Sequence, residues 1–341
     1  MKKRRPPLVA SLLAVLLLSV ALFAAADAGA APPKPYRFAP YVDMADYPPP
    51  SLSDIRTGGG VSHVSLGFVT AEEGTACKPT WGGYSEYAAS GRDAYLADQV
   101  RSFQGAGGDV VVSFGGQAGT ELATACKSVG ALTAAYRKAI SAYHADHVDF
   151  DVEGATISDS AANARRAKAI AKLQRGRGGK LVVSYTLPVL PTGLDDAGKA
   201  LVRNAVSKGV SIGIVNGMAM DYGEQAAPDP QDRMGDLAIS VANRMSGQLA
   251  GLLKVKAAQA MGRVGITPMI GVNDVPDEIF TLADARELVE FAGSAKLGMI
   301  GMWQLSRDRE CDGPTTETQL HCSGVDQGSW DFARALGSYA G

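Results

Sequence analysis

Eight short apolar stretches that alternate with segments of helical spacing limit the folds open to this chain. Apolar residues recur at helical positions in most of the intervening segments, for example in residues 160–176 and 282–296. Repeated strand-then-helix units predict parallel strands joined by right-handed crossovers, and eight such units close a (β/α)8 barrel. The eight expected strands are Tyr36–Met44, Val61–Val69, Gly108–Gly116, His147–Gly154, Lys180–Pro188, Val210–Met220, Arg263–Gly271 and Leu297–Leu305.

The alternative α/β architecture is an open doubly wound sheet. Neither GxGxxG nor GxxxxGK[ST] opens any of the strand-to-helix turns, which argues against the nucleotide-binding versions of that fold. No Pro/Ser/Thr-rich linker interrupts the chain after residue 34. We therefore expect an α/β fold of the (β/α)8 TIM barrel type, as one catalytic domain over residues 31–341.

The first 30 residues have the pattern of a secretory signal peptide. Residues 2–5 are basic, residues 8–26 form an uncharged apolar run, and residues 28–30 are small. A membrane anchor is the alternative, because nineteen residues are just long enough to span a bilayer. We expect cleavage, a secreted extracellular protein and no membrane association afterwards; the Arg4–Arg5 pair leaves the export route open.

Without residues 1–30 the chain has 29 Lys and Arg against 34 Asp and Glu, a formal net charge of −5. Binding to nucleic acid depends on a concentrated basic face that neutralises phosphates. A mildly acidic exported protein fits a neutral or weakly polar partner better, so no nucleic acid partner is expected.

Four cysteines in an exported chain predict two disulfides. Local pairing joins Cys311 with Cys322 and Cys77 with Cys126. No CxxC spacing occurs and the four histidines are scattered, which argues against a zinc site. No metal and no organic cofactor is expected.

The stretch HVDFDVEG, residues 147–154, places three acids at every second position. In a barrel strand Val148, Phe150 and Val152 would face the helices, so Asp149, Asp151 and Glu153 would point into the lumen. Like charges in a desolvated lumen are costly unless they share protons or pair, and this cost is typical of a catalytic site. At least one of the three pKa values should be raised, which suits a general acid for glycoside cleavage.

Two simpler interpretations of this stretch fit the sequence less well. A calcium-binding loop shares the acid spacing, but the twelfth position counted from Asp149 is Ser160 instead of a bidentate Glu. A solvated acidic edge strand conflicts with the apolar residues between the acids, which need burial.

The motif around these acids resembles a known family. Asp146, Asp149, Asp151 and Glu153 are similar to the DxxDxDxE signature of glycoside hydrolase family 18, the chitinase family. Three further stretches agree with this family: residues 113–116 resemble its SxGG on the third strand, GMAMDYG resembles its sixth-strand MxYD segment, and Trp303 resembles the Trp that ends its eighth strand. The resemblance covers essentially the whole chain after residue 30.

The resemblance implies a substrate-assisted retaining mechanism. Glu153 would protonate the glycosidic oxygen, while the substrate's own 2-acetamido group attacks the anomeric carbon. Asp151 would hold the acetamido N–H, and Asp149 would share a proton with Asp151 in the resting state. Asp146 would be structural.

The sixth strand departs from the family pattern, because Met220 stands where Tyr is common and Tyr222 follows Asp221. This MxMDY variant would turn Met218 and Met220 toward the lumen and place Asp221 at the strand end. Two tyrosines, Tyr222 and Tyr185, are then candidates for polarising the acetamido carbonyl. Trp303 would form a flat apolar floor under the sugar, with a core aromatic as the alternative. Tyr41, Asp43 and Trp81 lie near expected strand ends, where they could line a groove.

These expectations together describe an exported, monomeric chitinase acting on chitin or N-acetylglucosamine oligosaccharides. Some family members carry an extra domain after the seventh strand, but only about 25 residues separate the last two expected strands here. A shallow open groove and internal cutting are therefore expected. The alternatives are an endo-β-N-acetylglucosaminidase acting on glycoprotein glycans and a non-catalytic chitin-binding lectin.

Overall fold

The computed structural model describes residue 1 and residues 35–340. The expected signal peptide at residues 1–30 lies outside these residues except for Met1. Residues 35–340 belong to one compact unit. Among the described residues, no helix is long and apolar enough to cross a membrane.

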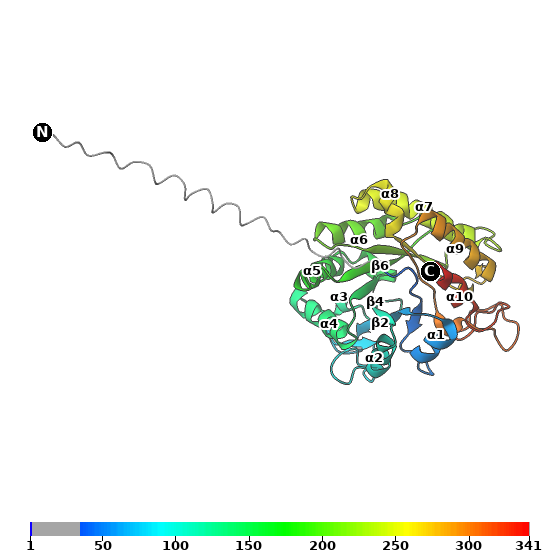
Figure 1. Cartoon of the computed structure of the whole chain (residues 1–341), viewed down its shortest axis with the longest axis horizontal. Helices are drawn as coiled ribbons and strands as arrows, with labels where there is room; N and C mark the ends of the chain where they lie inside the picture. Colours follow the sequence, from blue (N-terminus) through cyan, green and yellow to red (C-terminus); the bar gives the residue numbers. More distant parts are fainter. Residues whose placement is uncertain (2–34, 341) are drawn as a thin grey trace. The chain divides into compact units, whose positions relative to one another are not determined.

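Eight parallel strands form the barrel that the sequence predicts (Figure 1). Neighbouring strands follow chain order, as expected for repeated strand–helix units. The two ends of the sheet meet where Ala39 N donates to Ile300 O at 3.1 Å and Tyr41 N donates to Met302 O at 2.9 Å. The strands are β1 (Tyr41–Asp43), β2 (His63–Ala71), β4 (Asp109–Gly115), β5 (His147–Asp151), β6 (Val182–Pro188), β7 (Ile214–Ala219), β8 (Val264–Pro268) and β11 (Met299–Ile300).

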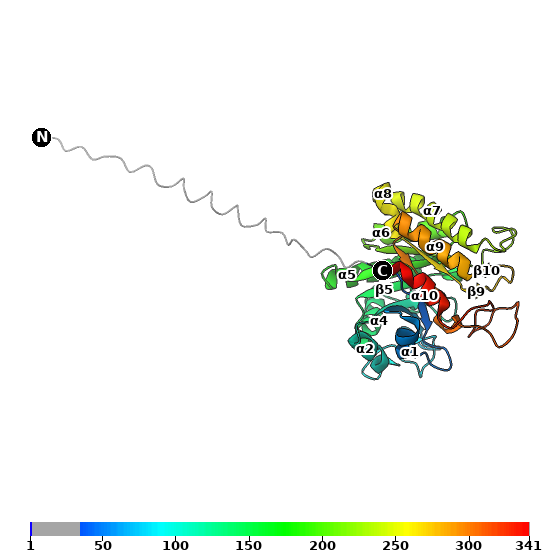
Figure 2. The same ribbon diagram turned by 45° about the vertical axis from the view of Figure 1, so that its right-hand side comes forward.

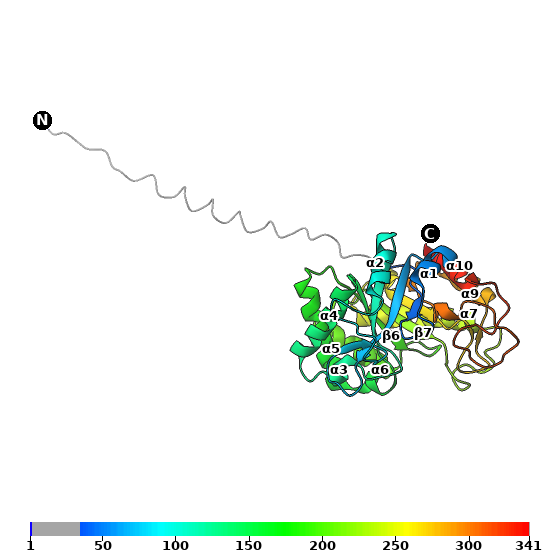
Figure 3. The same cartoon turned by 90° about the horizontal axis from the view of Figure 1, so that it is seen from below.

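Helices surround this sheet, as Figure 3 shows. The segment 160–176 expected to be helical is helix α5, whose N-cap Asp159 accepts from the backbone of Ala162. Segment 282–296 matches α9 to within one residue and begins with a capping box at Thr281. The helices are α1 (Leu52–Gly59), α2 (Ala97–Gly105), α3 (Leu122–Ala125), α4 (Val129–Ala142), α5 (Ser160–Gly176), α6 (Asp196–Ser207), α7 (Met234–Leu252), α8 (Ala257–Ala260), α9 (Leu282–Ala295) and α10 (Asp331–Gly337).

Seven of the eight barrel strands are shorter than the apolar runs that predicted them, and β2 has the expected length but begins two residues later. Strand β5 ends at Asp151, so Glu153 lies just past the strand, and β7 begins at Ile214 instead of Val210. Hydrophobic runs include the loop residues that pack against the barrel ends, which is why they overestimate strand length. Three short strands were not predicted: β3 (Pro79–Trp81), β9 (Gly271–Val272) and β10 (Ile279–Phe280).

The two faces of the strands differ in polarity. Val148 and Phe150 of β5 face the helices, where Phe150 packs against Phe114 and Tyr136 at ring-centroid distances of 5.4 and 5.2 Å. The lumen near the carboxyl ends of the strands is polar and shielded from solvent. It contains Ser113, Asp149, Asp151, Ser184, Thr186, Asn216 and Thr267, all buried.

Both expected disulfides are present, Cys77–Cys126 and Cys311–Cys322. The second lies in the long loop between β11 and α10. Figure 2 shows this loop on the same side of the barrel as β9 and β10, and Val272 N donates to Ser323 O at 2.8 Å. The disulfide loop and the β9–β10 hairpin therefore build one rim of the barrel mouth.

Candidate active site

Strand β5 directs two carboxyl groups into the lumen. Asp149 and Asp151 are 2% and 3% exposed, although both are ionisable. The parallel register places Asp149 between Ser113 and Ser184, and Asp151 between Gly115 and Thr186. Glu153 follows at the lip of the barrel and is half-buried.

Asp149 is surrounded by hydroxyl donors. Its Oδ1 accepts from Ser184 Oγ at 2.6 Å and Thr186 Oγ1 at 2.9 Å, and its Oδ2 accepts from Ser113 Oγ at 2.7 Å and Tyr41 Oη at 3.1 Å. Burial raises the pKa of Asp149, while these hydrogen bonds lower it. Four donors leave an ionised carboxylate well solvated by the protein itself.

Asp151 and Glu153 form a coupled pair of carboxyl groups. Burial raises the pKa of Asp151 well above 3.8, and the charges of Glu153 and Asp149 raise it further. The pKa of Glu153 is raised by burial and by Asp221, and is lowered by its hydrogen bond with Asp151. Two carboxyl groups joined in this way hold one proton between them near neutral pH. We therefore expect a shared proton between Asp151 and Glu153, whereas Asp149 bonds to hydroxyl groups.

Two glycines, Gly115 and Gly116, allow strand β4 and the residue after it to lie very close to these acids. A Cβ atom on Gly115 would lie 1.9 Å from the carbonyl oxygen of Asp151, and the φ of Gly115 is +111°. Gly116 N donates to that same oxygen at 3.2 Å. Only glycine at position 115 permits this approach, which accounts for its place in the SxGG segment.

Trp303 lies over the lumen in contact with two other aromatic rings. Its ring is 5.6 Å from Phe68 in a stacked arrangement and 5.9 Å from Tyr41 in an edge-on one. Tyr41 in turn donates to Asp149, so one side chain, that of Tyr41, lies between the indole and the acid row. Trp303 is half-buried and leaves surface for a ligand.

Asp221 occupies the rim directly after β7, as the bend in the MxMDY segment suggested. Its φ of +50° is rare for a residue other than glycine. Val275 N, on the β9–β10 hairpin, donates to its Oδ1 at 3.0 Å. Partial burial raises the pKa of Asp221 to about 6, and the charge of Asp274 adds to this rise. Met218 and Met220, nearby on β7 and just after it, are half-buried.

Tyr222 is held by a buried carboxylate that sequence reasoning missed. Glu278 is fully buried and accepts from Tyr222 N at 3.0 Å and Gly223 N at 2.8 Å. The hydroxyl of Tyr222 is buried and has no hydrogen-bond partner among the described residues. Burial raises the pKa of Tyr222, so its phenol remains protonated and able to donate.

Two residues expected near the groove lie elsewhere. Tyr185 pairs with Phe150 across β5 and β6 and packs 5.7 Å from its ring, on the helix side of the sheet. Because side chains alternate along a strand, Tyr185 points away from the lumen that Ser184 and Thr186 enter. Trp81 is fully buried, and its indole N–H donates to Tyr143 at 2.7 Å. Neither side chain can reach a ligand in the mouth.

Some site residues that the sequence analysis did not identify could have been recognised from a sequence pattern, and others could not. Ser184 and Thr186 alternate with apolar residues in SYTLP, so the period that revealed the acids could have revealed these donors. Phe68 and Glu278 carry no such signal, because their roles depend on contacts with residues far along the chain. Asp146, expected to be structural, forms an exposed ion pair with Arg177 at 2.9 Å.

The arrangement combines two neighbouring carboxyl groups with raised pKa values, a flat aromatic surface, and a phenol that has no hydrogen-bond partner among the described residues. These groups are suited to acid catalysis on a sugar-like ligand. Over residues 35–340, no group of three or more His, Cys, Asp or Glu side chains is placed to hold a metal ion.

Comparisons with known proteins give two curated relatives. The chain is 37% identical over 280 residues to a probable bifunctional chitinase/lysozyme of Escherichia coli. It is 35% identical over 282 residues to endochitinase 11 of Metarhizium anisopliae. Each match covers 80% of this chain but only 31% and 52% of the relative. The chain therefore spans about a third and about half of the lengths of these proteins. No family model matches the chain.

A solved structure matches over nearly its full length. It is the catalytic domain of a hyperthermophilic chitinase from Pyrococcus furiosus, with a TM-score of 0.79 and 31% identity. The match covers 91% of this chain and 96% of that domain. With this identity and coverage, and with the acid row, the glycine pair and Trp303 placed around one barrel mouth, the chain belongs to glycoside hydrolase family 18, the chitinase family.

Proposed function

We propose that this protein is a secreted chitinase that hydrolyses β-1,4 links between N-acetylglucosamine units. The proposal rests chiefly on one observation, the pair of neighbouring carboxyl groups of Asp151 and Glu153 at the mouth of the barrel, both with raised pKa values. Crystal structures of catalytic-site mutants of the Pyrococcus domain contain chito-oligosaccharides, which supports this substrate class. Two disulfides agree with an oxidising compartment. We further propose a cleaved leader at residues 1–30, a catalytic domain over 31–341, and a monomer.

The proposed mechanism is retaining and substrate-assisted. In the MxMDY segment, Met220 stands where the family commonly has a tyrosine, so we propose another tyrosine for that role. Glu153 donates its proton to the glycosidic oxygen as the bond to the anomeric carbon breaks. The acetamido carbonyl oxygen of the same sugar attacks that carbon and forms a cyclic intermediate. Glu153, now a carboxylate, then takes a proton from the water that opens the intermediate.

The residues around Glu153 have distinct proposed roles. The ionised Asp149 raises the proton affinity of Asp151, so Asp151 can hold the acetamido group and balance its developing positive charge. The Tyr222 hydroxyl, which has no hydrogen-bond partner among the described residues, would donate to the acetamido oxygen. Trp303 supports the apolar face of the sugar, and Asp221 tunes the charge of Glu153. Met218 and Met220 would line the mouth nearby.

We also propose that the enzyme cuts within chains. Apart from the short β9–β10 hairpin, only α9 is inserted between β8 and β11, so no large domain walls the mouth on that side. An open groove admits the middle of a polymer. The sizes of early products from long N-acetylglucosamine oligomers would show this, since release of dimers alone from one end would contradict it.

A comparison of wild type with Glu153→Gln tests the proposed activity. On N-acetylglucosamine oligomers we expect cleavage by wild type and a loss of at least about 10³-fold in the variant, with sugar binding retained. Glutamine has nearly the same shape but cannot donate the proton. Preferential cleavage of a high-mannose glycopeptide would instead indicate the endo-β-N-acetylglucosaminidase, and oligomer binding without cleavage by wild type would indicate a lectin.

A further inference from the structure

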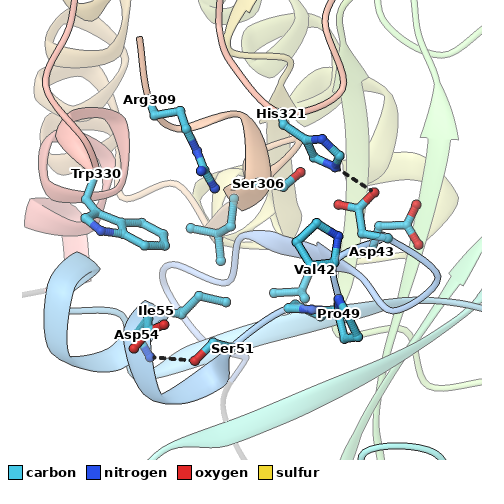
Figure 4. Close-up of a pocket in the computed structure, with 14 residues that line it drawn as sticks. Val42, Asp43, Pro49, Ser51, Asp54, Ile55, Ser306, Arg309, His321 and Trp330 are labelled. Atoms are coloured by element: carbon cyan, nitrogen blue, oxygen red, sulfur yellow. Dashed lines mark hydrogen bonds and ion pairs between the residues drawn. The ribbon is translucent and has the colours of Figure 1, made fainter. Parts of the chain in front are cut away.

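A second cavity lies outside the barrel, on the other side of strand β1. Its volume is about 320 Å³, and its walls are helix α1, the loop that precedes it, and the disulfide loop after β11 (Figure 4). Val42 lines it, and Val42 faces away from the lumen because its neighbour Tyr41 points inward to Asp149. None of the residues proposed for catalysis lines this cavity.

One wall of the cavity is a rigid aromatic surface. The indole of Trp330 lies flat on α1, where a Cβ atom on Gly58 would come within 2.7 Å of its Nε1 and one on Gly59 within 3.1 Å of its Cε3. Figure 4 shows the ring extending toward Ile55. The apolar face of a sugar ring packs well against an indole held in this way.

The opposite end of the cavity is polar and incompletely bonded. His321 Nε2 and Asp46 Oδ1 lie 3.7 Å apart, too far for a good hydrogen bond. His321 Nε2 and Asp46 Oδ2 are both buried and have no hydrogen-bond partner in the part of the chain that the structure describes. His321 and Asp46 both line the cavity, and a ligand hydroxyl inserted between them could accept from the imidazole and donate to the carboxylate once the two side chains move apart.

The guanidinium group of Arg309 is a further hydrogen-bond donor that faces this cavity. Its side chain points into the cavity in Figure 4 and can bridge two ligand oxygens. Arg309 partly offsets the charge of the three aspartates that line the cavity, Asp43, Asp46 and Asp54, and the remaining negative charge disfavours an anionic ligand. The volume is close to the lower limit for small-molecule pockets, so one sugar unit fits better than a chain.

The cavity opens beside the proposed catalytic mouth. Asp43 lines it and also ends strand β1, where its N–H donates to Gln304 Oε1 at 3.2 Å. Gln304 directly follows Trp303. A polymer segment bound here would therefore be kept close to the mouth.

We propose that this cavity is a second carbohydrate site that binds one N-acetylglucosamine unit of the polymer. The identity of the sugar rests on the proposed function, while the cavity's suitability for a sugar ring rests on its own residues. Such a site would help to retain the enzyme on its substrate.

The three tryptophans of the chain allow both sites to be tested at once. In the full chain carrying Glu153→Gln and 5-fluorotryptophan, Trp303 reports on the mouth, Trp330 on the cavity, and the buried Trp81 on the fold. Titration with the N-acetylglucosamine trimer should move the fluorine resonances of Trp303 and Trp330 to saturation. Asp46→Ala and Arg309→Ala should each weaken the Trp330 response at least fivefold and leave the Trp303 curve within twofold. Glu310→Ala, which alters an exposed neighbour outside the cavity, is the matched control and should change neither response.

The outcomes separate this inference from the proposed function. A Trp303 response without a Trp330 response would overturn the second site and leave the proposed function standing. A Trp330 response that neither Asp46→Ala nor Arg309→Ala weakens, with the Trp81 resonance unchanged, would overturn it too. A Trp330 response alone would support the cavity and contradict sugar binding at the mouth. An equal Trp330 response to cellotriose would overturn the assignment to N-acetylglucosamine.

Discussion

Single residues in this site differ in charge because their immediate surroundings differ. Asp149 and Asp151 are two positions apart on one strand and equally buried. Burial raises the pKa of both. Four hydroxyl donors oppose this rise at Asp149, whereas Asp151 Oδ1 has no hydrogen-bond partner among the described residues and the nearby Glu153 raises the pKa of Asp151 further. One position is thus suited to hold a charge and the other to hold a proton.

Asp151→Asn should make the protein more stable at neutral pH. The folded-state pKa of Asp151 lies well above 3.8, so between about pH 4 and that pKa the folded state binds more protons than the unfolded state. Wild-type stability therefore falls as the pH rises through this window, by about 1.4 kcal/mol for each unit of pKa shift. Melting temperatures measured from pH 4 to 8 should show the variant above wild type at pH 7, with the difference vanishing near pH 4. Parallel curves for the two proteins would contradict this assignment.

Tyr222→Phe should separate stability from activity. The Tyr222 hydroxyl is buried and has no partner within residues 35–340, so its removal should leave the free energy of unfolding unchanged or raise it by up to about 1 kcal/mol. If the hydroxyl donates to the reacting acetamido oxygen, the rate of oligomer cleavage should fall by about 10²-fold. Denaturant unfolding and initial rates on the same oligomer measure the two effects. A variant with wild-type rates would remove Tyr222 from the mechanism.

Among the elements, the short β9–β10 hairpin holds several residues of the site in position through hydrogen bonds. Val275 N bonds to Asp221, and Glu278 accepts the N–H groups of Tyr222 and Gly223. The short hairpin thus fixes the segment after β7, where Asp221 has a left-handed backbone conformation.

Glu278→Ala should destabilise the fold by about 2–4 kcal/mol, because two buried N–H groups lose their acceptor. Activity should fall further than stability explains, since Tyr222 would lose its fixed position. Asp277→Ala, which changes the exposed neighbour on the same hairpin, is the control and should stay within about 0.5 kcal/mol of wild type. Equal unfolding curves for the two variants would show that Glu278 does not anchor this segment.

Regular elements were predictable from sequence where one period dominated. Helix α5 was predicted with the right ends because its apolar spacing is uniform and Asp159 caps it. Strand β5 was recognised from its alternation, although Glu153 falls outside it. The β9 and β10 strands have two residues each, too few to show any period, so the hairpin and Glu278 could not be found. Tyr185 was misplaced because a tyrosine suits either face of a strand.

At the scale of the whole molecule, the closed barrel brings the catalytic candidates together from β1, β5, β7 and β11. The number of strand–helix units predicted this closure. The second cavity was not predictable, because it forms where α1, α10 and the disulfide loop meet. These segments lie far apart in the sequence, and no local sequence pattern indicates that they are in contact.

The two disulfides should contribute unequally to the stability of the whole chain. Cys77–Cys126 closes a loop with a sequence separation of 49, and Cys311–Cys322 one of 11. On the chain-entropy view, replacing the first pair by alanines should cost about 4 kcal/mol and the second about 3 kcal/mol. Losing Cys311–Cys322 should also loosen His321 and weaken the Trp330 response to sugar. Denaturant unfolding of the two double variants measures the difference, and a greater loss for the shorter loop would contradict the entropic account.

The central claim is that Asp151 and Glu153 hold one proton between them while Asp149 stays ionised. Carbon-13 NMR of carboxyl-labelled protein tests this most directly, with Asp151→Asn, Glu153→Gln and Asp149→Asn used to assign the resonances. The account predicts that at pH 7 one proton remains on the Asp151–Glu153 pair and none on Asp149. Carboxyl resonances of Asp151 and Glu153 that both titrate near pH 4, or a proton found on Asp149 at neutral pH, would contradict it.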